Sequence, residues 1–191
     1  MQKILSLLRR CVEDYDMIAP GERVAVGVSG GKDSLVLLAA LARLAQFYPG
    51  GFSVEAFTVD MGTPGMDLSP LADYCRELGV PFHRIPTQMY HVIFETRREK
   101  NPCALCAKMR RGSLHTALLE AGIHKVALGH HYDDVIETIL MGMLWGAQVQ
   151  TMMPKLHSTN FEGMELIRPL YYVREDAIKA WRDCNGLHFI Q

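Results

Sequence analysis

The chain has 191 residues, of which 49% are hydrophobic and 21% are charged, which is enough for one core with helices on both sides of a sheet but not comfortably for two. Lys and Arg number 20 against 21 Asp and Glu, so the formal net charge is -1, which excludes a global positive field as the means of attracting a polyanion. We therefore expect one domain over residues 1–191, opened by a short N-terminal helix.

The N-terminal segment indicates a cytoplasmic protein. It reads "MQKILSLLRRCVEDYDMIAP", with apolar residues at helical spacing among charges, no long apolar core and no small-residue cleavage site. No apolar run approaches the length that spans a bilayer, so no membrane partner is expected. The 5 cysteines are odd in number, and only Cys103 and Cys106 are close together, which favours a reduced compartment over a secreted disulfide framework.

Apolar periodicity, with Gly and Pro as stops, predicts strands that alternate with helices. In chain order the expected elements are a helix over 2–18, a strand over 23–28, a helix over 34–47, a strand over 53–60, a helix over 68–78, a strand over 81–85, a helix over 104–120, a strand over 125–129, a helix over 133–145, a loop around "MMPKLHS", the segment "MELIRPL", a helix starting near Arg174 and a last short strand "LHFI".

This order predicts an α/β fold with a doubly wound, mostly parallel sheet and helices on both faces. Ligand sites in such folds lie beyond the carboxyl ends of the strands. The loops at 29–34, 60–67 and 129–134 fall on that edge.

The turn "SGGKDS" at 29–34 joins the first strand to the second helix. Gly30 and Gly31 let the backbone approach a ligand closely, the helix presents free N–H groups and its positive dipole end, and Lys32 adds a mobile cation. Such a turn suits phosphate. It is neither the Gly-x-x-x-x-Gly-Lys-Ser/Thr loop nor Gly-x-Gly-x-x-Gly, which disfavours the usual kinases, GTPases and dehydrogenases. A plain tight turn with Ser34 as helix cap is the alternative.

After an apolar strand, "SGGKDS" resembles the PP-loop of ATP pyrophosphatases, which cleave ATP between the α- and β-phosphates. Two later segments, "PCALCAKMRRG" at 102–112 and "GHHYDDVIETIL" at 129–140, narrow the resemblance to the tRNA 2-thiocytidine synthetase family. "MMPKL" and "IRPLYYVRE" are also similar to that family, so the resemblance covers nearly the whole chain. It implies an adenine nucleotide alpha hydrolase-like fold, ATP and Mg²⁺ as cofactors, and tRNA as a partner.

The residues expected to contact ATP share a place at the carboxyl edge of the sheet. They are Ser29, Gly30, Gly31, Lys32, Asp33, Ser34, Asp60, Gly129, His130 and Asp134. Lys32, Asp33 and Asp133 are the expected catalytic residues, with Asp133 nearest the reaction. Adjacent carboxylates facing a triphosphate suit Mg²⁺, which takes oxygen ligands and shares them with phosphates. Acids at the start of a helix are also favoured by its dipole without any ligand, which is the alternative.

Cys103 and Cys106 form a Cys-x-x-Cys pair that can grip one metal centre. A redox dithiol, an unligated pair or half of a zinc site use the same spacing, although no second Cys-x-x-Cys completes a zinc site. The resemblance implies a 4Fe-4S cluster held by three cysteines, with one iron open to carry sulfur. The family's third cysteine lies just beyond a segment matching "LHFIQ", whereas the sequence ends at Gln191. A missing C-terminal tail could carry it; Cys75 and Cys184 do not match its position.

A basic run between Arg97 and Arg111 surrounds the cysteine pair. A solvated face is the default reading of such a run, but Arg110 and Arg111 are candidates for RNA binding, with one base entering the site from a single-stranded loop.

Together these features predict a sulfurtransferase that adenylates the O2 carbonyl of a cytidine in tRNA and replaces AMP with sulfur to give 2-thiocytidine. The sulfur donor would be sulfide or a persulfide carrier, and family members are often dimers, which makes a homodimer a candidate assembly. The alternatives are another PP-loop tRNA-modifying ligase or an amidase-type synthetase without a cluster, and a non-catalytic nucleotide- or metal-binding sensor.

Overall fold

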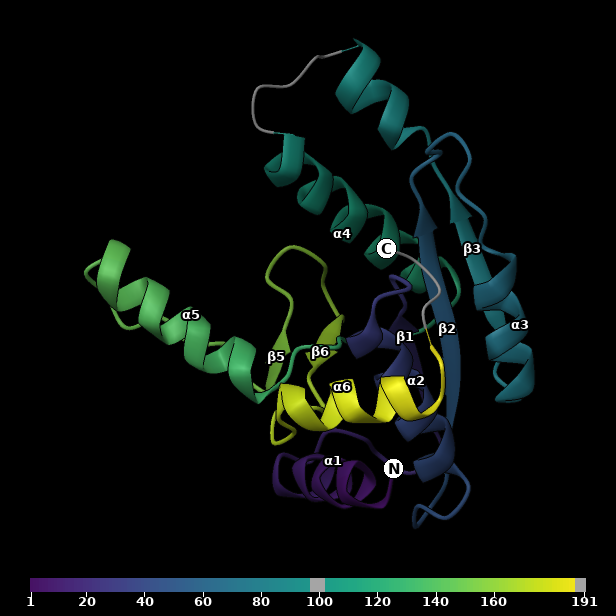
Figure 1. Cartoon of the computed structure of the whole chain (residues 1–191), viewed down its shortest axis with the longest axis vertical. Coiled ribbons are helices and arrows are strands. Elements are labelled where there is room, and N and C mark those ends of the chain that lie inside the picture. The colour runs from purple at the N-terminus through teal and green to yellow at the C-terminus, as the bar shows by residue number, and fades with distance from the viewer. Residues whose placement is uncertain (97–101, 188–191) are drawn as a thin grey trace.

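The computed structural model describes residues 1–96 and 102–187. Its strands in chain order are β1 (Glu22–Gly27), β2 (Phe52–Asp60), β3 (Phe82–Pro86), β4 (Lys125–Ala127), β5 (Lys155–His157) and β6 (Glu165–Ile167). They form a 6-stranded sheet in the order β3-β2-β1-β4-β6-β5. Neighbouring strands are parallel except for β5, which runs antiparallel to β6. The predicted mostly parallel, doubly wound sheet is confirmed (Figure 1).

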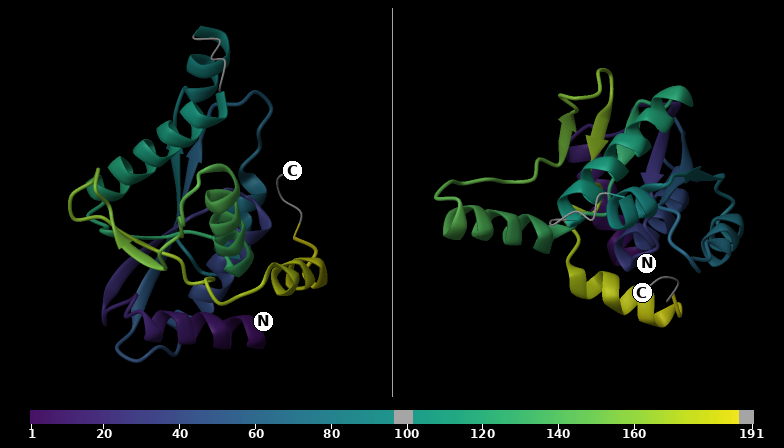
Figure 2. Two further views of the ribbon diagram at one scale, coloured as in Figure 1. Left: turned by 90° about the vertical axis from the view of Figure 1, so that its left-hand side faces the viewer. Right: turned by 90° about the horizontal axis from the view of Figure 1, so that it is seen from above.

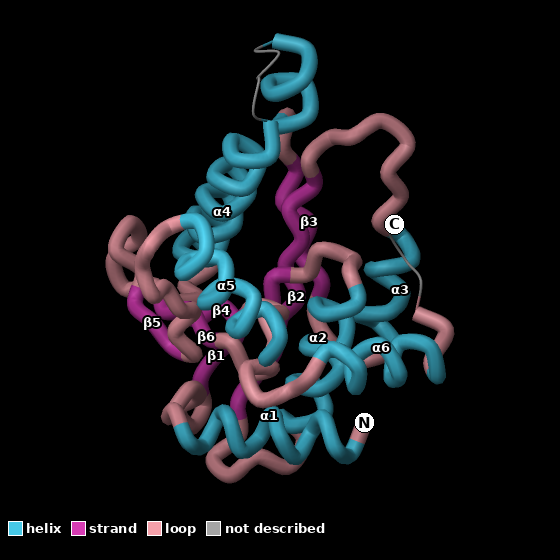
Figure 3. The backbone as a smooth tube through the Cα atoms, turned by 60° about the vertical axis from the view of Figure 1, so that its left-hand side comes forward, coloured by secondary structure: helices cyan, strands magenta, loops and turns pink. Residues whose placement is uncertain are grey.

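Most of the helices lie in the connections between the strands, while one precedes the first strand and one follows the last (Figure 3). They are α1 (Gln2–Asp14), α2 (Lys32–Ala45), α3 (Ser69–Glu77), the π-helix η1 (His91–Thr96), α4 (Pro102–Glu120), α5 (Tyr132–Trp145) and α6 (Glu175–Cys184). None of the described helices is both long and apolar enough to cross a membrane. α5 leaves the body of the molecule and projects away from the sheet, as Figures 1 and 2 show.

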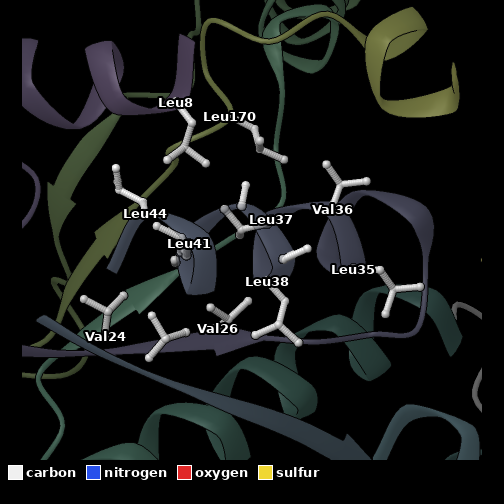
Figure 4. Packing of buried hydrophobic residues seen from close by; sticks show 14 of the residues in the cluster. Leu8, Val24, Val26, Leu35, Val36, Leu37, Leu38, Leu41, Leu44 and Leu170 are labelled. Atoms are coloured by element: carbon white, nitrogen blue, oxygen red, sulfur yellow. The ribbon is translucent and has the colours of Figure 1, made fainter. Parts of the chain in front are cut away.

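Two hydrophobic clusters lie on opposite faces of the sheet. Alternate side chains of β1 separate them, because Val24 and Val26 join the larger cluster and Ala25 joins the smaller one. The larger cluster packs α1, α2, α3 and α6 against the sheet, with Leu37 of α2 fully buried (Figure 4). The smaller cluster contains Leu118 of α4. Helices therefore cover both faces, as predicted.

The strand register brings two loops together at the carboxyl edge. Gly27 at the end of β1 pairs with Phe57 of β2, and Val26 pairs with Ala127 at the end of β4. The chain order reverses between β1 and β4, since β2 and β3 lie on one side and β6 on the other. The loops after β1 and β4 therefore emerge side by side at the switch point, where doubly wound folds bind ligands.

Several predicted boundaries were wrong. The first helix ends at Asp14 rather than at 18, because Asp16 takes a positive φ of 45° and the N–H of Met17 bonds back to the Val12 carbonyl. The segment around "MMPKLHS" was expected to be a loop but contains β5, and η1 was not predicted. Of the predicted last strand at 187–190, Leu187 is described and is not in a strand, and residues 188–190 lie outside the described residues.

Candidate functional site

The turn after β1 is closed by its own serines. Ser34 Oγ donates to the Gly31 carbonyl at 2.9 Å and accepts from the N–H of Ser29 at 3.2 Å. Gly30 has a φ of +83°, a backbone conformation that residues other than glycine rarely adopt. Gly31 is the N-cap of α2, so the turn leads directly into the N–H groups of the first turn of that helix. The local geometry is that of an anion-binding helix N-terminus.

Gly129, two residues beyond β4, lets its loop touch this turn. A Cβ at Gly129 would lie 3.1 Å from the carbonyl carbon of Asp33 and 3.1 Å from the backbone nitrogen of Ser34. Both neighbours are backbone atoms, which cannot give way cheaply. The two predicted ATP-binding segments are therefore in direct contact, and a side chain at position 129 would push them apart by a few tenths of an ångström.

A cavity of about 470 Å³ opens beside this contact. Its wall combines the turn, the middle of α4, the loop after β4 and apolar side chains of the sheet: Gly27, Val28, Ser29, Asp33, Ser34, Phe57, Val59, Ala107, Arg110, Arg111, Leu114, His115, Leu128, Gly129, His130, Asp134 and Leu166. The cavity thus has a polar end near the phosphate-type turn and an apolar end against the sheet. Its size is in the range of small-molecule sites.

Several buried polar atoms on the cavity wall make no hydrogen bond to the protein. Among the described residues these are Asp33 Oδ1, His115 Nδ1 and His130 Nδ1, although Asp33 Oδ1 lies 3.6 Å from His131 Nε2. Burial lowers the pKa of His115, and the nearby charge of Arg111 lowers it further. Burial also lowers the pKa of His130, and the charge of Arg168 acts in the same direction. An unpaired buried polar atom is costly unless a ligand or water satisfies it. These atoms mark the cavity as a binding site.

Asp134, not Asp133, lies on the cavity wall. Its Oδ2 also accepts from the backbone N–H of His131 at 2.8 Å, which caps α5. The Asp133 carboxylate faces α6 instead, where Oδ2 accepts from the backbone N–H of Glu175 at 2.8 Å. The structure therefore gives Asp133 a helix-capping contact, and its catalytic role stays a prediction.

Lys32 is not among the described residues that line the cavity. Its Nζ lies 3.0 Å from Asp33 Oδ2 and 3.1 Å from Glu175 Oε1. Burial alone would lower the pKa of Lys32, but hydrogen bonds to the two carboxylates raise it above its ordinary value. The ammonium group is thus charged and is held beside the turn.

Asp60 ends β2 but is likewise absent from the cavity wall among the described residues. Its Oδ1 accepts from the N–H of Gly62 at 2.9 Å, and its Oδ2 accepts from Arg84 Nε at 2.7 Å. The hydrogen bond from Gly62 lowers the pKa of Asp60 and Arg84 adds to this, against the opposing effect of burial. These contacts give Asp60 a structural place at the β2–β3 edge, and its predicted contact with ATP stays a prediction.

The cysteine pair lies in the first turns of α4, at the same edge of the sheet as the cavity. Cys103 is exposed and Cys106 is partly buried. Cys106 Sγ lies 3.4 Å from the sulfur of Met61, the residue that follows β2. The spacing of Cys103, Ala107 and Arg110 places them on one face of the helix. Ala107 and Arg110 line the cavity, whereas Cys103 and Cys106 are not among the described residues on its wall. The thiols therefore lie next to the site on the same helical face.

The other cysteines are poor candidates for metal ligands. Cys11 and Cys75 are buried in the larger hydrophobic cluster, and burial raises their pKa to about 12 and about 11, respectively. Cys184 is exposed at the end of α6, and α6 lies apart from the start of α4 (Figure 1). No third thiol joins Cys103 and Cys106 within the described residues, and the third ligand has no assignment there.

Metal binding by protein groups alone is not supported in the described part of the chain, where no three His, Cys, Asp or Glu side chains are arranged around a common point. Asp33 and Asp134 nevertheless both line the cavity. Two carboxylates fit Mg²⁺, which commonly completes its shell with substrate phosphates and water.

Arg110 and Arg111 lie on the cavity wall, and their predicted contact with RNA stays a prediction. Of the basic run that contains them, residues 97–101 lie outside the described residues.

The profile of the PP-loop domain matches residues 2–191. The chain belongs to the PP-loop domain family. Its membership and the predicted fold are thereby confirmed.

Curated relatives of this PP-loop protein are named tRNA-cytidine(32) 2-sulfurtransferase. The protein from Anaeromyxobacter dehalogenans is 38% identical over 183 residues, which cover 95% of this chain and 63% of the relative. The protein from Cellvibrio japonicus is 39% identical over 193 residues, which cover 98% of this chain and 64% of the relative. The chain therefore spans a little under two thirds of the length of these relatives.

Two solved structures share the fold. A U34-tRNA thiolase from Methanococcus maripaludis, solved with its 4Fe-4S cluster, has a TM-score of 0.79 and 22% identity, covering 100% of this chain and 65% of that one. An NH3-dependent NAD synthetase from Campylobacter jejuni has a TM-score of 0.59 and 17% identity, covering 98% of this chain and 74% of that one. These likenesses support the PP-loop fold of this chain.

Two residues at the site were not predicted from the sequence. His115 lies within the apolar pattern of α4, where a histidine reads as part of the core, and it makes an edge-to-face contact with Phe161 at 4.7 Å between ring centroids. Glu175 reads as an ordinary acid at the start of a helix. The only signal for Glu175 was its place in "IRPLYYVRE", one of the segments that carried the family resemblance.

Proposed function

We propose that this PP-loop protein uses ATP to thiolate a cytidine in tRNA, giving 2-thiocytidine. The supporting observation is that one cavity is lined both by the turn at 29–34 and by the helix that begins with the cysteine pair. ATP activation and sulfur delivery need such a common space. The names of the curated relatives support tRNA cytidine as the substrate.

ATP would place its phosphates at the N-terminus of α2 and its adenine at the apolar end of the cavity. Ser29 and Ser34 hold the turn in shape, and the helix dipole favours the phosphate charge. Asp33 and Asp134 are the residues on the wall that would hold Mg²⁺ with the phosphates, and Phe57 offers an aromatic surface at the sheet. Lys32, whose ammonium group is paired with Asp33 and Glu175 beside the turn, is the cation that would meet the phosphates.

The proposed reaction has two stages. The O2 atom of the cytosine attacks the α-phosphorus of ATP and pyrophosphate leaves, which turns the oxygen into part of a good leaving group. A sulfur nucleophile at the sulfide level then replaces AMP at carbon 2. Arg110 and Arg111 would bind the phosphate backbone while the base occupies the cavity.

Cys103 and Cys106 would supply two ligands of a 4Fe-4S cluster. They fit because they are one helical turn apart, accessible, and on the helix that lines the cavity. Bound there, a cluster with one open iron supplies a site that carries sulfur. We place the protein in the cytoplasm, where thiols stay reduced, with a homodimer as the candidate assembly. The donor would be sulfide, or a persulfide carrier whose outer sulfur is reduced to sulfide by a thiol that ends as a disulfide.

The function is tested by mass spectrometry of tRNA nucleosides from cells with and without the gene, together with anaerobic iron and sulfide analysis of the protein. We expect 2-thiocytidine to disappear without the gene and to stay absent with Cys103→Ser. Cys184→Ser is the matched control, because Cys184 is exposed on α6 and is absent from the cavity wall among the described residues. Unchanged thionucleosides would refute the substrate, and full activity of Cys103→Ser would favour a PP-loop ligase without a cluster.

A further inference from the structure

Glu175, the first residue of α6, connects three parts of the site region. Its Oε1 lies 3.1 Å from Lys32 Nζ of the PP-loop turn, and its Oε2 lies 2.8 Å from Lys179 Nζ one turn along α6. Its backbone N–H donates to Asp133 Oδ2 of α5 at 2.8 Å. Hydrogen bonds from Lys179 first and then Lys32 lower the pKa of Glu175 to about 2, so its carboxylate is ionised throughout the neutral range.

The position of Glu175 is fixed by contacts that do not involve its side chain. Ile178 and Val173 on either side of it are fully buried in the larger hydrophobic cluster. The Asp133 carboxylate caps the backbone N–H of Glu175. The glutamate side chain therefore extends from a rigid point, and replacing it leaves both the packing and the cap of α6 in place.

Lys32, by contrast, has a flexible four-carbon stem and needs an external partner to fix its ammonium group. Its other carboxylate partner is Asp33, which is adjacent in the chain and lies on the cavity wall. If Asp33 turns to Mg²⁺ when ATP binds, Glu175 is the partner that still holds Lys32. A cation that is held in place next to the phosphates stabilises the transition state more than a mobile cation does.

We propose that Glu175 is a positioning residue that holds the Lys32 ammonium group beside the phosphate-binding turn. This inference rests on the proposed ATP-dependent reaction. Glu175 acts through Lys32 and is not itself placed on the cavity wall among the described residues.

The first test is a double-mutant cycle on tRNA-dependent pyrophosphate release by the whole protein. Glu175→Gln should lower kcat about tenfold with the KM for ATP changed less than about twofold, because misplacing a catalytic group costs rate more than binding. In a Lys32→Ala background the same change should have less than about a twofold further effect. Glu175→Asp keeps a shortened carboxylate and should fall between Glu175→Gln and the wild type. A tenfold loss in both backgrounds, or no loss in either, would overturn the inference.

Lys179→Gln is the matched control, since it removes the other partner of the same carboxylate and should leave kcat within about twofold of the wild type. A second readout is independent of turnover: the ammonium signals of ¹⁵N-labelled lysines, with Lys32 assigned by its loss in Lys32→Ala. Glu175→Gln should shift the Lys32 signal and speed its proton exchange, whereas Lys179→Gln should not. An unshifted Lys32 signal would overturn the inference. If the wild type releases no pyrophosphate with any tRNA, the proposed function fails while this signal still decides the role of Glu175.

Discussion

Acidic side chains near the carboxyl edge of the sheet differ in what they contact. Asp33 and Asp134 lie on the cavity wall, whereas Asp60 and Asp133 do not among the described residues. Asp60, Asp133 and Asp134 each accept a hydrogen bond from a backbone N–H group, and breaking such a bond to bind an ion costs free energy. At the scale of single residues, Asp33 is therefore the acid most available to ATP and Mg²⁺, Asp134 combines a place on the wall with capping of α5, and Asp60 and Asp133 stabilise the fold.

Replacing Asp60 by Asn should lower the free energy of unfolding by about 2 kcal/mol at pH 7, the usual value of hydrogen bonds to a charged group. The hydrogen bond from Gly62 and the pairing with Arg84 lower the pKa of Asp60 in the folded protein, so this stability is present above the unfolded pKa of about 3.9 and is lost as the pH falls through the lower folded value. Urea unfolding at pH 7, 5 and 3 measures it. A difference between the two proteins that grows toward pH 3 would contradict the assignment.

Replacing His115 by Leu should weaken ATP binding while leaving the free energy of unfolding nearly unchanged. The change removes a buried Nδ1 that has no partner among the described residues but also an aromatic contact with Phe161, so we expect the free energy of unfolding to stay within about 1 kcal/mol of the wild type. The Kd for ATP should rise about tenfold if the ligand supplies the missing hydrogen bond, which is worth about 1.4 kcal/mol. Calorimetric titration with ATP checks this, and an unchanged Kd would exclude His115 from the site.

At the scale of elements, the N-terminus of α6 depends on α5. The Asp133 carboxylate accepts from the first backbone N–H of α6 and lies 3.6 Å from an Arg174 guanidinium nitrogen. Capping by an acidic side chain satisfies an N–H group that the helix itself cannot. The contact also fixes the helix that carries Glu175.

Asp133→Ala should therefore lower the free energy of unfolding by about 1 kcal/mol, the typical value of a lost helix cap. Amide hydrogen exchange should quicken in the first turn of α6. Glu137→Ala is the control, because Glu137 is an exposed acid on α5 and its removal should change stability by less than about 0.5 kcal/mol. Equal effects of the two changes would argue against the cap.

The elements that the sequence predicted well are those with strong local patterns. The β-branched run of β1 and the Leu-rich and Ala-rich stretch of α2 have clear preferences, and the glycines between them mark the turn. β5 was missed because its three residues are too few to show an alternating pattern, and the strand is defined by its pairing with β6. The same holds for the site. Ser29 and Gly129 were predicted because the sequence motifs around them are local, whereas the ion pair of Lys32 with Glu175 depends on how α6 packs against α2.

At the scale of the whole molecule, the sheet and its covering helices contrast with α5. Leu37 of α2 is completely buried, whereas Leu144 and Trp145 at the end of α5 are 73% and 82% exposed. The projecting helix (Figure 2) contributes little to the core. Stability should therefore be concentrated in the packed body.

Leu37→Ala should lower the free energy of unfolding by about 3 kcal/mol, because it leaves a cavity in a close-packed core. Trp145→Gln, although it removes a larger apolar side chain, should change it by less than about 0.5 kcal/mol. Chemical unfolding of both variants measures the two values. A large loss in Trp145→Gln would mean that α5 is buried in solution.

Because Cys103, Cys106 and the cavity-lining residues belong to one helix, α4 fixes the distance and the rotation between the thiols and the cavity wall. Its rise of about 1.5 Å per residue puts Cys103 about 6 Å from Ala107 along the axis, and each residue turns the helix by about 100°. One alanine inserted between Cys106 and Arg110 would rotate the thiols out of phase with the cavity wall while leaving every side chain chemically intact. The number of residues in this segment is therefore as much a part of the site as their identity, and substitutions there should be tolerated where changes of length are not.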